Sequence, residues 1–497
     1  MRLLSAAKLL LCFFGSVTEA TSLIPRSPYS LSPEVEAVCS LIRSQYPNLL
    51  AWDPAGPHGF ESVGLTSAYN EAVSSYISLA SVNQRPACIL FPSDAQQVSY
   101  AVRTLNLHPE VRFGLKSGGH NGNLGFSTAL GGLLIAFRPN SLFAVPAKDG
   151  QSVLVGAGCK WKDVYAALQP LGKAAVGARY DNVGVTGYIL GGGLSFLSSQ
   201  YGFACDNVLS FECVLGDGSI VTASPSSHPD LYFALRGGGN QFAIVTRMTL
   251  RTYDVGQKGI VWGGVRLYDV SKRNRLLAAI SKFTGNSSSD VKAAIFPIFN
   301  FGAVVGAHFP FVVVTFFYDG PQPGSNIFRP FDGIPSLYGD TGPTTYRDLH
   351  AKFLGGNIRG LNVVYRVNTF PNMPPAIMSS FLRRHYKMLE KAAANASNGD
   401  LIDAKVFSFE VQPVPHSIAE ASLRIGGGNA LSLDPKHGDR VWITYLYNPI
   451  FMNHAMYDQK VLQSYGNETY GRLKAIQKRY DSAGLFSKRQ GGFHFED

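Results

Sequence analysis

The sequence lacks several patterns that would point directly to a class of function. No block of five or six Lys or Arg accompanies the formal charge of +10, so a nucleic-acid groove, which needs clustered cations and aromatics, is not expected. No G-x-x-x-x-G-K-[ST] phosphate loop and no G-x-S-x-G nucleophile elbow occurs. His108, His120 and His494 share no metal-ligand spacing. We therefore expect neither a serine hydrolase nor a metal site.

Long apolar runs are also scarce. Residues 1–20 contain Arg2 and Lys8, an apolar run and small residues ending at Ala20, which is the layout of a secretory signal peptide. A membrane anchor is the alternative, but the run is too short to span a bilayer, and no second stretch of about 20 apolar residues follows. The sequence predicts secretion, or entry into the secretory pathway, without a membrane span.

Cysteine is infrequent, and its spacing fits no zinc pattern. Without Cys12 in the signal segment, five cysteines remain, and an odd number in an oxidising compartment implies one or two disulfides and a free thiol. We expect Cys39 and Cys88 to pair, because they bracket the N-terminal segment, and the other three to be buried thiols. The predicted glycosylation sites are Asn286, Asn395 and Asn467.

The chain of 497 residues is too long for one compact core. Up to about residue 255, short strands alternate with glycine-rich turns and a few helices, including one capped by Ser93 or Asp94. From 256 to 440, aromatic and β-branched runs alternate with helical stretches, which predicts an α+β domain with a second sheet covered by helices. An amphipathic helix and a short polar tail end the sequence.

Three glycine clusters are the most informative feature: "SGGHNGNLGF" at 117–126, "VGVTGYILGGGLSFLSSQYG" at 183–202 and "RGGGNQFAIVT" at 236–246. Glycine lets backbone amides approach a ligand closely, so three such loops predict a large anionic ligand such as a dinucleotide. A Rossmann site is the rival interpretation, but "VGAGCKW" after a predicted strand lacks the third glycine of G-x-G-x-x-G.

These motifs, with "KSGGH" at 116–120 and "YDSAGLF" at 480–486, resemble the berberine bridge enzyme-like group of secreted flavin oxidases in the vanillyl-alcohol oxidase superfamily. Their order holds from about residue 80 to the C-terminus, and the length and closing "GGF" look most like fungal members, many of which act in secondary metabolism. The resemblance implies an α+β fold. A PCMH-type FAD-binding domain of two small α/β subdomains would comprise 21–82, 83–255 and a returning segment, 441–497. A substrate domain with an antiparallel sheet would comprise 256–440.

The resemblance also implies a set of FAD contacts. His120 matches the histidine that bonds covalently to the 8α-methyl group of FAD. The expected non-covalent contacts are Lys116, Ser117, Gly118, Gly119, Asn121, Gly122, Val183, Gly184, Gly187, Gly192, Gly193, Asn207, Ile244 and Asn453.

The sequence departs from the family pattern at three positions. Lys116 stands where the loop usually begins with Arg, which keeps the charge but loses the planar fork. Tyr180 occupies the place of the second anchoring Cys of bicovalent members, so the expected linkage is monocovalent, through His120 alone. His454 replaces a tyrosine that acts as the base in some members.

The catalytic base is left open between several groups. His454 is a candidate because an imidazole titrates near neutral pH, but it would equally fit a position packed against the flavin or facing solvent. Tyr445, Tyr447 and Glu410 are rivals, and Glu410 lies in "FSFEVQPV", which predicts a strand lining the second domain. Val183 falls where family members gate oxygen access to the flavin.

The expected function is a secreted FAD oxidase of a small, hydrophobic secondary metabolite. Hydride would pass from an alcohol or amine to flavin N5, and O2 would be reduced to H2O2, with or without cyclisation of the product. A carbohydrate oxidase, a dehydrogenase that excludes oxygen and a flavin-bearing binding protein without turnover are the alternatives. A small-molecule substrate and O2 are the expected partners, and a monomer is favoured.

Overall fold

The first glycine cluster follows a small sheet, in which the order is β1-β2-β4-β3 and β4 runs parallel to β2 and β3. The strands are β1 (Leu50–Trp52), β2 (Cys88–Leu90), β3 (Phe113–Lys116) and β4 (Leu133–Ala136). The surrounding helices are α2 (Pro33–Gln45), α3 (Val63–Ser74), α4 (Leu79–Val82) and α5 (Ala95–Leu107). Asp94 caps α5 by accepting from the Gln97 backbone N–H, so the predicted helix start is confirmed. The computed structural model describes residues 30–59, 62–304, 307–324, 326–352, 365–397, 406–443 and 452–496.

A second, antiparallel sheet follows, with the order β5-β6-β10-β8-β9. Its strands are β5 (Ala144–Pro146), β6 (Ser152–Gly156), β8 (Val208–Val214), β9 (Ile220–Ala223) and β10 (Ile244–Arg251), while β7 (Lys173–Ala174) pairs separately with β11 (Tyr253–Asp254). The helices here are α6 (Trp161–Leu168), α7 (Val185–Leu190), α8 (Ser198–Tyr201) and α9 (Pro229–Leu235). The strands β8 and β9 form a hairpin whose turn contains Asp217 and Gly218. This sheet and its helices form much of the largest core of the molecule.

The third sheet is antiparallel throughout, with the order β15-β12-β14-β13-β18-β19-β17 and β16 paired to β12. Its strands are β12 (Ile260–Asp269), β13 (Ala293–Val304), β14 (Ala307–Tyr318), β15 (Tyr338–Gly339), β16 (Gly342–Thr345), β17 (Asn368–Pro371), β18 (Val406–Val414) and β19 (Arg440–Ile443). Its helical neighbours are α10 (Arg273–Asn286), α11 (Tyr346–Ala351), α12 (Pro375–Ser397) and α13 (His416–Gly426). The predicted α+β architecture is therefore confirmed.

The alternation of side chains along β18 decides what each face of this sheet does. Phe409 and Val411 point into a core shared with α10 and α12, whereas Glu410 lies on the opposite face, which lines a cavity. Neighbouring side chains along a strand point to opposite faces, so apolar packing and a polar site come from one short strand.

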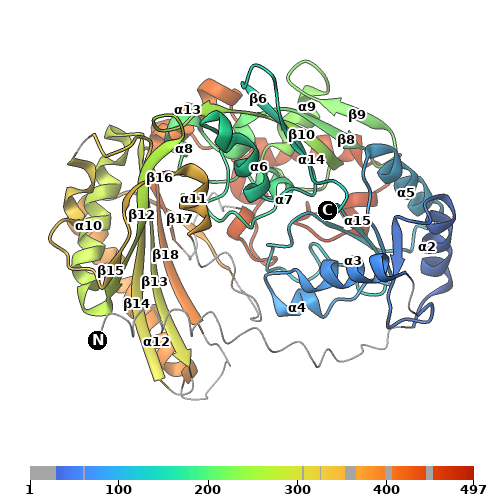
Figure 1. Ribbon diagram of the computed structural model, residues 1–497, viewed down its shortest axis with the longest axis horizontal. Coiled ribbons are helices and arrows are strands. Elements are labelled where there is room, and N and C mark those ends of the chain that lie inside the picture. The colour runs from blue at the N-terminus through green and yellow to red at the C-terminus, as the bar shows by residue number, and fades with distance from the viewer. Residues whose placement is uncertain are drawn as a thin grey trace.

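The C-terminal elements return to the first half of the molecule. In Figure 1 the red helices α14 (Asn467–Tyr480) and α15 (Leu485–Arg489) lie beside the blue and green segments, away from the sheet of β12, β13 and β14. Arg489 fixes this return by donating hydrogen bonds to the carbonyl oxygens of Leu105, His108 and Val111. The predicted polar tail thus docks against α5 and the residues that follow it.

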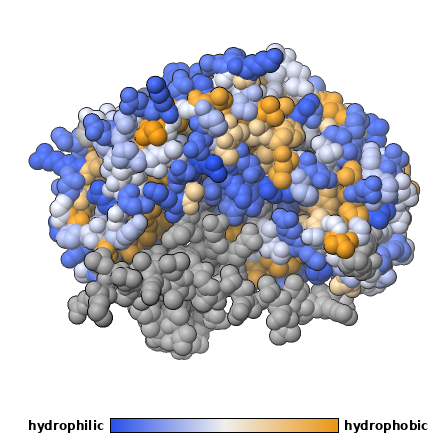
Figure 2. Space-filling view, viewed as in Figure 1, coloured by the Kyte–Doolittle hydropathy of each residue, from blue (hydrophilic) through white to orange (hydrophobic). Residues whose placement is uncertain are grey.

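The cysteines of the described residues adopt the expected states. Cys39 and Cys88 form a disulfide, and Cys159, Cys205 and Cys213 are buried thiols. Among the described residues, no helix is both long and apolar enough to cross a bilayer. Figure 2 shows that, on this face, apolar groups of the described surface are small and separated by hydrophilic residues. The predicted signal segment, 1–20, lies outside the described residues.

Candidate active site

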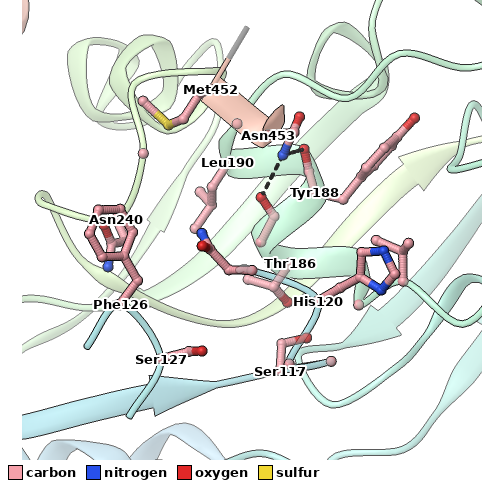
Figure 3. A pocket seen from close by; sticks show the side chains of 18 of the residues that line it. Ser117, His120, Phe126, Ser127, Thr186, Tyr188, Leu190, Asn240, Met452 and Asn453 are labelled. Atoms are coloured by element: carbon pink, nitrogen blue, oxygen red, sulfur yellow. Dashed lines mark hydrogen bonds between the residues drawn. The ribbon is translucent and has the colours of Figure 1, made fainter. Parts of the chain in front are cut away.

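A cavity lies where the glycine loops, the inner face of β18 and the C-terminal segment meet. Figure 3 shows Phe126 and Asn240 on one side of it, and His120 and Tyr188 on the other. The predicted contact residues that line the cavity are Ser117, Gly118, Gly119, His120, Asn121, Val183, Gly184, Gly187, Ile244 and Asn453. Two of the four candidate bases, Glu410 and His454, line it as well. Residues from distant parts of the sequence are therefore brought to one site.

The first two glycine loops touch through their backbones. A Cβ added to Gly118 would lie 2.4 Å from the Gly184 nitrogen, and one added to Gly184 would lie 2.4 Å from the Gly118 nitrogen. No side chain fits in that space, so both positions require glycine. The contact places two stretches of bare backbone side by side along the cavity, as an anionic dinucleotide requires.

Side-chain hydrogen bonds hold these loops in place. Ser117 Oγ and Thr186 Oγ1 both donate to the carbonyl oxygen of Ala157, at 2.7 and 3.1 Å. Asn453 accepts from the Gly193 backbone N–H at 3.0 Å. Its Nδ2 donates to the carbonyl oxygens of Gly187 at 3.3 Å and Tyr188 at 3.2 Å (Figure 3). One asparagine from the C-terminal segment thus fixes both α7 and the glycine turn after it.

Five predicted contact residues lie outside the cavity lining: Lys116, Gly122, Gly192, Gly193 and Asn207. Lys116 Nζ turns away, because it donates to Ser75 Oγ at 2.7 Å and sits over the Tyr76 ring. The side-chain amide of Asn207 makes only local hydrogen bonds. It donates to two carbonyl oxygens and accepts from the Tyr253 hydroxyl at 2.6 Å.

The remaining three, Gly122, Gly192 and Gly193, adjoin lining residues such as Asn121 and Gly191 but do not line the cavity themselves. Beyond Gly122, Asn123 is bonded to Ala455 and Tyr457. Gly192 and Gly193 form the turn that Asn453 holds.

Polar and aromatic side chains gather beside His120. They are Arg179, Tyr180, Tyr365, Glu410 and His454. The rings of His120 and Tyr180 are 6.5 Å apart, and those of Tyr365 and His454 are stacked at 5.8 Å. This end of the cavity therefore combines several proton-bearing groups with aromatic walls, whereas the glycine loops offer mainly backbone.

Burial makes His120 a neutral imidazole. Loss of solvent, followed by the nearby positive charge of Lys160, lowers the pKa of His120 to about 4. A neutral ring nitrogen keeps its lone pair, so the side chain at this position is a nucleophile at neutral pH.

Burial acts in opposite directions on the two candidate bases in the cavity. Burial, together with the positive charge of Arg179, lowers the pKa of His454 to about 3. It raises the pKa of Glu410, against the opposing effects of Arg179 and a hydrogen bond from Gln412. An effective general base has a pKa near the working pH, so these shifts favour Glu410 over His454. Tyr445 and Tyr447 lie outside the described residues.

Sequence reasoning missed several residues of the cavity. Arg179 follows no motif, and the other missed lining residues include Phe126, Asn240, Tyr365, Met452, Gly492 and Phe493. The Phe126 and Phe493 rings meet edge to face at 5.1 Å, although 367 positions separate them (493 − 126). Phe126 and Asn240 lie within the quoted glycine clusters, and "GGF" at 491–493 gave a signal of the same kind, because adjacent glycines permit close backbone contact. In the described part of the chain, no cluster of His, Cys, Asp and Glu could hold a metal ion.

Comparisons with known proteins agree with this geometry. The model of the FAD binding domain family matches residues 86–224, which contain the first two glycine loops. The FAD-dependent monooxygenase FUP4 of Fusarium proliferatum is 32% identical over 476 residues, which cover 88% of this chain and 90% of the relative.

Two solved structures share the fold at low sequence identity. The 6-hydroxy-D-nicotine oxidase of Arthrobacter nicotinovorans has a TM-score of 0.66 at 20% identity, covering 86% of this chain and 96% of that one. The glucooligosaccharide oxidase of Acremonium strictum has a TM-score of 0.64 at 15% identity, covering 90% and 98%. That enzyme carries a 6-S-cysteinyl, 8α-N1-histidyl FAD.

Proposed function

The chain belongs to the berberine bridge enzyme-like FAD-linked oxidoreductases of the vanillyl-alcohol oxidase superfamily. On this basis, we propose that it is an oxidase of a small, apolar metabolite. The observation that carries the proposal is the single cavity surface formed by the glycine loops and by Glu410, His454 and Tyr180. A cofactor lying on the loops would present its reactive ring to these side chains. FAD, when bound, supplies hydride acceptance and the reduction of O2 to H2O2.

The residues of the cavity fit that cofactor. The Gly118–Gly184 contact leaves backbone accessible along the site, and Gly187 borders space that a Cβ would enter without meeting any atom within 4 Å. Ser117 and Asn453 hold the loops from opposite ends of the sequence. Such a prearranged cradle binds an anionic dinucleotide without reorganising.

We propose that His120 carries FAD covalently and that no second bond is made. The neutral imidazole supplies the lone pair for the bond, and Tyr180, at the expected position of a second anchor, has no thiol to offer. Peptide mass after denaturation tests this directly. Wild-type peptide containing His120 should retain the flavin, whereas His120→Ala should release all of it. Free FAD from denatured wild type would refute the linkage.

We propose that Glu410 removes the substrate proton. Its raised pKa makes the carboxylate a stronger base than usual, while desolvation weakens His454 as a base. Proton removal by Glu410 would assist hydride loss from the adjacent carbon, leaving a carbonyl or imine. His454 then serves as a wall of the cavity, stacked on Tyr365.

Oxygen use separates the oxidase from its alternatives. The purified holoenzyme should be reduced by a substrate without oxygen, and about one H2O2 should form per product under air. Reduction by substrate without H2O2 formation would identify a dehydrogenase, and no reduction by any substrate class would support a binding protein. The relative named as a monooxygenase adds one further test: incorporation of label from ¹⁸O2 into product would favour that activity.

A carbohydrate oxidase is the second candidate, because a glucooligosaccharide oxidase shares the fold. The walls beside His120 include Tyr180 and Tyr365, and Phe296 packs on the ring of Tyr180. Aromatic rings accept either a sugar face or an apolar ring, so the choice needs a direct comparison. Oligosaccharides and aromatic alcohols should be compared as reductants of the same holoenzyme. Faster reduction by the sugars would replace the apolar metabolite as the proposed substrate.

We also propose that the protein enters the secretory pathway. The layout of residues 1–20 supports this, as do the disulfide and the exposed sequons Asn286 and Asn467 at ends of α10 and α14. The side chain of the third sequon residue, Asn395, lies outside the description. Protein recovered from the medium should lose mass on treatment with an N-glycosidase. An unglycosylated protein retained in the cytosol would contradict the proposal.

A further inference from the structure

Arg179 is a cation held inside the cavity, and neither the glycine loops nor the candidate bases explain it. The residue is 8% exposed and lines the cavity between Ala178 and Tyr180. Burial lowers the pKa of its guanidinium, which indicates that the charge is poorly solvated. An arginine nevertheless remains ionised at neutral pH.

Two contacts fix the direction of the guanidinium. Its central carbon lies 4.1 Å from the centre of the Phe296 ring, and its Nη2 donates to Gln412 Oε1 at 2.6 Å. Gln412, itself 2% exposed, donates through Nε2 to Glu410 Oε2 at 3.2 Å. Arg179 and Glu410 are thus joined through an amide, side by side on one wall.

The positive charge of Arg179 has no direct counter-ion among the described residues. The charge of Glu410 acts on Arg179 from a distance, but the amide of Gln412 lies between the two groups and takes the hydrogen bond that a paired carboxylate would take. A guanidinium has five N–H donors, and the described residues take one of them. Burying a cation with so few hydrogen bonds costs free energy of folding, unless a ligand supplies the missing acceptors.

The wall around Arg179 limits what that ligand can be. The rings of Tyr180 and Phe296 meet at 6.0 Å in an edge-on arrangement, and Tyr365 also borders the cavity. An aromatic body fits against the rings of Tyr180 and Tyr365, which line the cavity, whereas Phe296 is buried and packs on Tyr180 from outside the lining. The planar guanidinium matches an anionic oxygen group. Glu410, held at a fixed offset by Gln412, is then free to act on a different part of the same molecule.

We propose that Arg179 binds an anionic oxygen of the substrate, so the substrates are small aromatic compounds bearing a carboxylate or phenolate in addition to the carbon that is oxidised. This inference rests on the proposed oxidase function and names its substrate class. Arg179 is then a residue that determines specificity, because a neutral analogue would leave its guanidinium buried and unpaired.

Two probes of nearly equal shape test the role of charge. Benzoate and benzamide would be titrated into the FAD-containing protein, and binding followed by the change in the flavin absorption spectrum. We expect benzoate to bind at least about tenfold more tightly, as charge-assisted hydrogen bonds are stronger than neutral ones. Phenolate at high pH, compared with benzyl alcohol, distinguishes the two kinds of anionic oxygen.

Variants then assign the preference to one residue. Arg179→Met should abolish the preference for benzoate, and Arg179→Lys should keep part of it, since charge remains but the fork is lost. Arg347→Met removes a positive charge from an exposed position outside the cavity and should change nothing. FAD content and thermal unfolding report whether each variant is folded.

The outcomes separate this inference from the proposed function. Equal affinity for the two probes, no binding of benzoate, or an undiminished preference in a folded Arg179→Met variant would overturn it. An FAD-containing protein that is reduced by neutral alcohols yet ignores probe charge would keep the oxidase proposal and lose only this inference. The wild-type comparison decides the matter even where the Arg179 variants do not fold.

Discussion

Among single residues, Glu410 is the group whose ionisation we expect to control turnover. Burial raises its pKa, and a general base acts only when deprotonated, so activity should rise as the pH passes through that raised pKa. Glu410→Gln should lower the rate of anaerobic flavin reduction about 10²–10⁴-fold and remove this acidic limb from the pH profile. Stopped-flow absorbance over a range of pH measures both effects.

A comparison at His454 separates the two candidate bases. His454→Ala should reduce the rate less than Glu410→Gln does and should preserve the acidic limb, because its pKa of about 3 leaves the imidazole neutral throughout the working range. Glu468→Gln, a charge change at an exposed position of α14, serves as the control. If the acidic limb of the pH profile disappeared only in the His454 variant, His454 rather than Glu410 would be the catalytic base.

The predicted contact residues whose identity the structure explains best are those that the backbone requires to be glycine. Gly118 and Gly184 could be recognised because no other residue permits the contact that they make. Asn207 was predicted from a motif to contact the cofactor, yet its amide serves Tyr253 and nearby carbonyls. Arg179 gave no signal, since its partners Phe296 and Gln412 come from strands more than 100 positions away.

At the scale of elements, the segment 489–496 is the main departure from expectation. Its composition predicts a polar tail, but it packs as a wall of the cavity. Gln490 donates to the Asn240 carbonyl at 2.7 Å, and a Cβ on Gly491 would lie 2.0 Å from the Gly125 carbonyl oxygen. Composition does not reveal docking that depends on loops hundreds of positions earlier.

We expect this segment to retain FAD. In a His120→Ala background, where release can be followed, Phe493→Ala should speed FAD dissociation by about tenfold, because an aromatic contact at the cavity wall is lost. Phe495→Ala is the matched control: its ring packs on Phe242 and Tyr470, and it does not line the cavity. Flavin fluorescence after dilution measures the rates. Equal rates for the two variants would mean that the segment only covers the core.

The strands of the third sheet were easier to predict than their function. Aromatic and β-branched runs identified β13, β14 and β18 because such residues pack well on a pleated surface. The alternation that sends Phe409 to the helices and Glu410 to the cavity follows from the strand itself. The tertiary arrangement decides which face of the sheet meets the glycine loops. The residue pattern of a single strand does not predict that arrangement.

For the whole molecule, the Cys39–Cys88 disulfide ties α2 to the first sheet across a sequence separation of 49. Cross-linking restricts the unfolded chain, so the double variant Cys39→Ser, Cys88→Ser should lose about 2–4 kcal/mol in the unfolding of this region. Denaturant titration followed by tryptophan fluorescence measures the loss, since Trp52 pairs with Cys88 on adjacent strands.

The flavin spectrum should not change in the same variant, because neither cysteine lines the cavity. Reducing agent applied to the wild type is the corresponding control and should reproduce the loss of stability. A variant as stable as the wild type would show that the bond adds nothing to folding, and a changed spectrum would show that the first sheet is coupled to the site.

The distribution of the cavity wall along the sequence has a consequence for how the protein matures. The glycine loops all precede residue 250, whereas Asn453, His454, Gly492 and Phe493 follow residue 450. Chains are synthesised from the N-terminus, and their early parts begin to fold first. A ribosome-bound chain that ends at β10 therefore contains the glycine loops but lacks the C-terminal residues that complete the cavity wall. Flavin captured at that point would be free to leave, so we expect stable loading late in biosynthesis, after residue 493 has emerged from the ribosome.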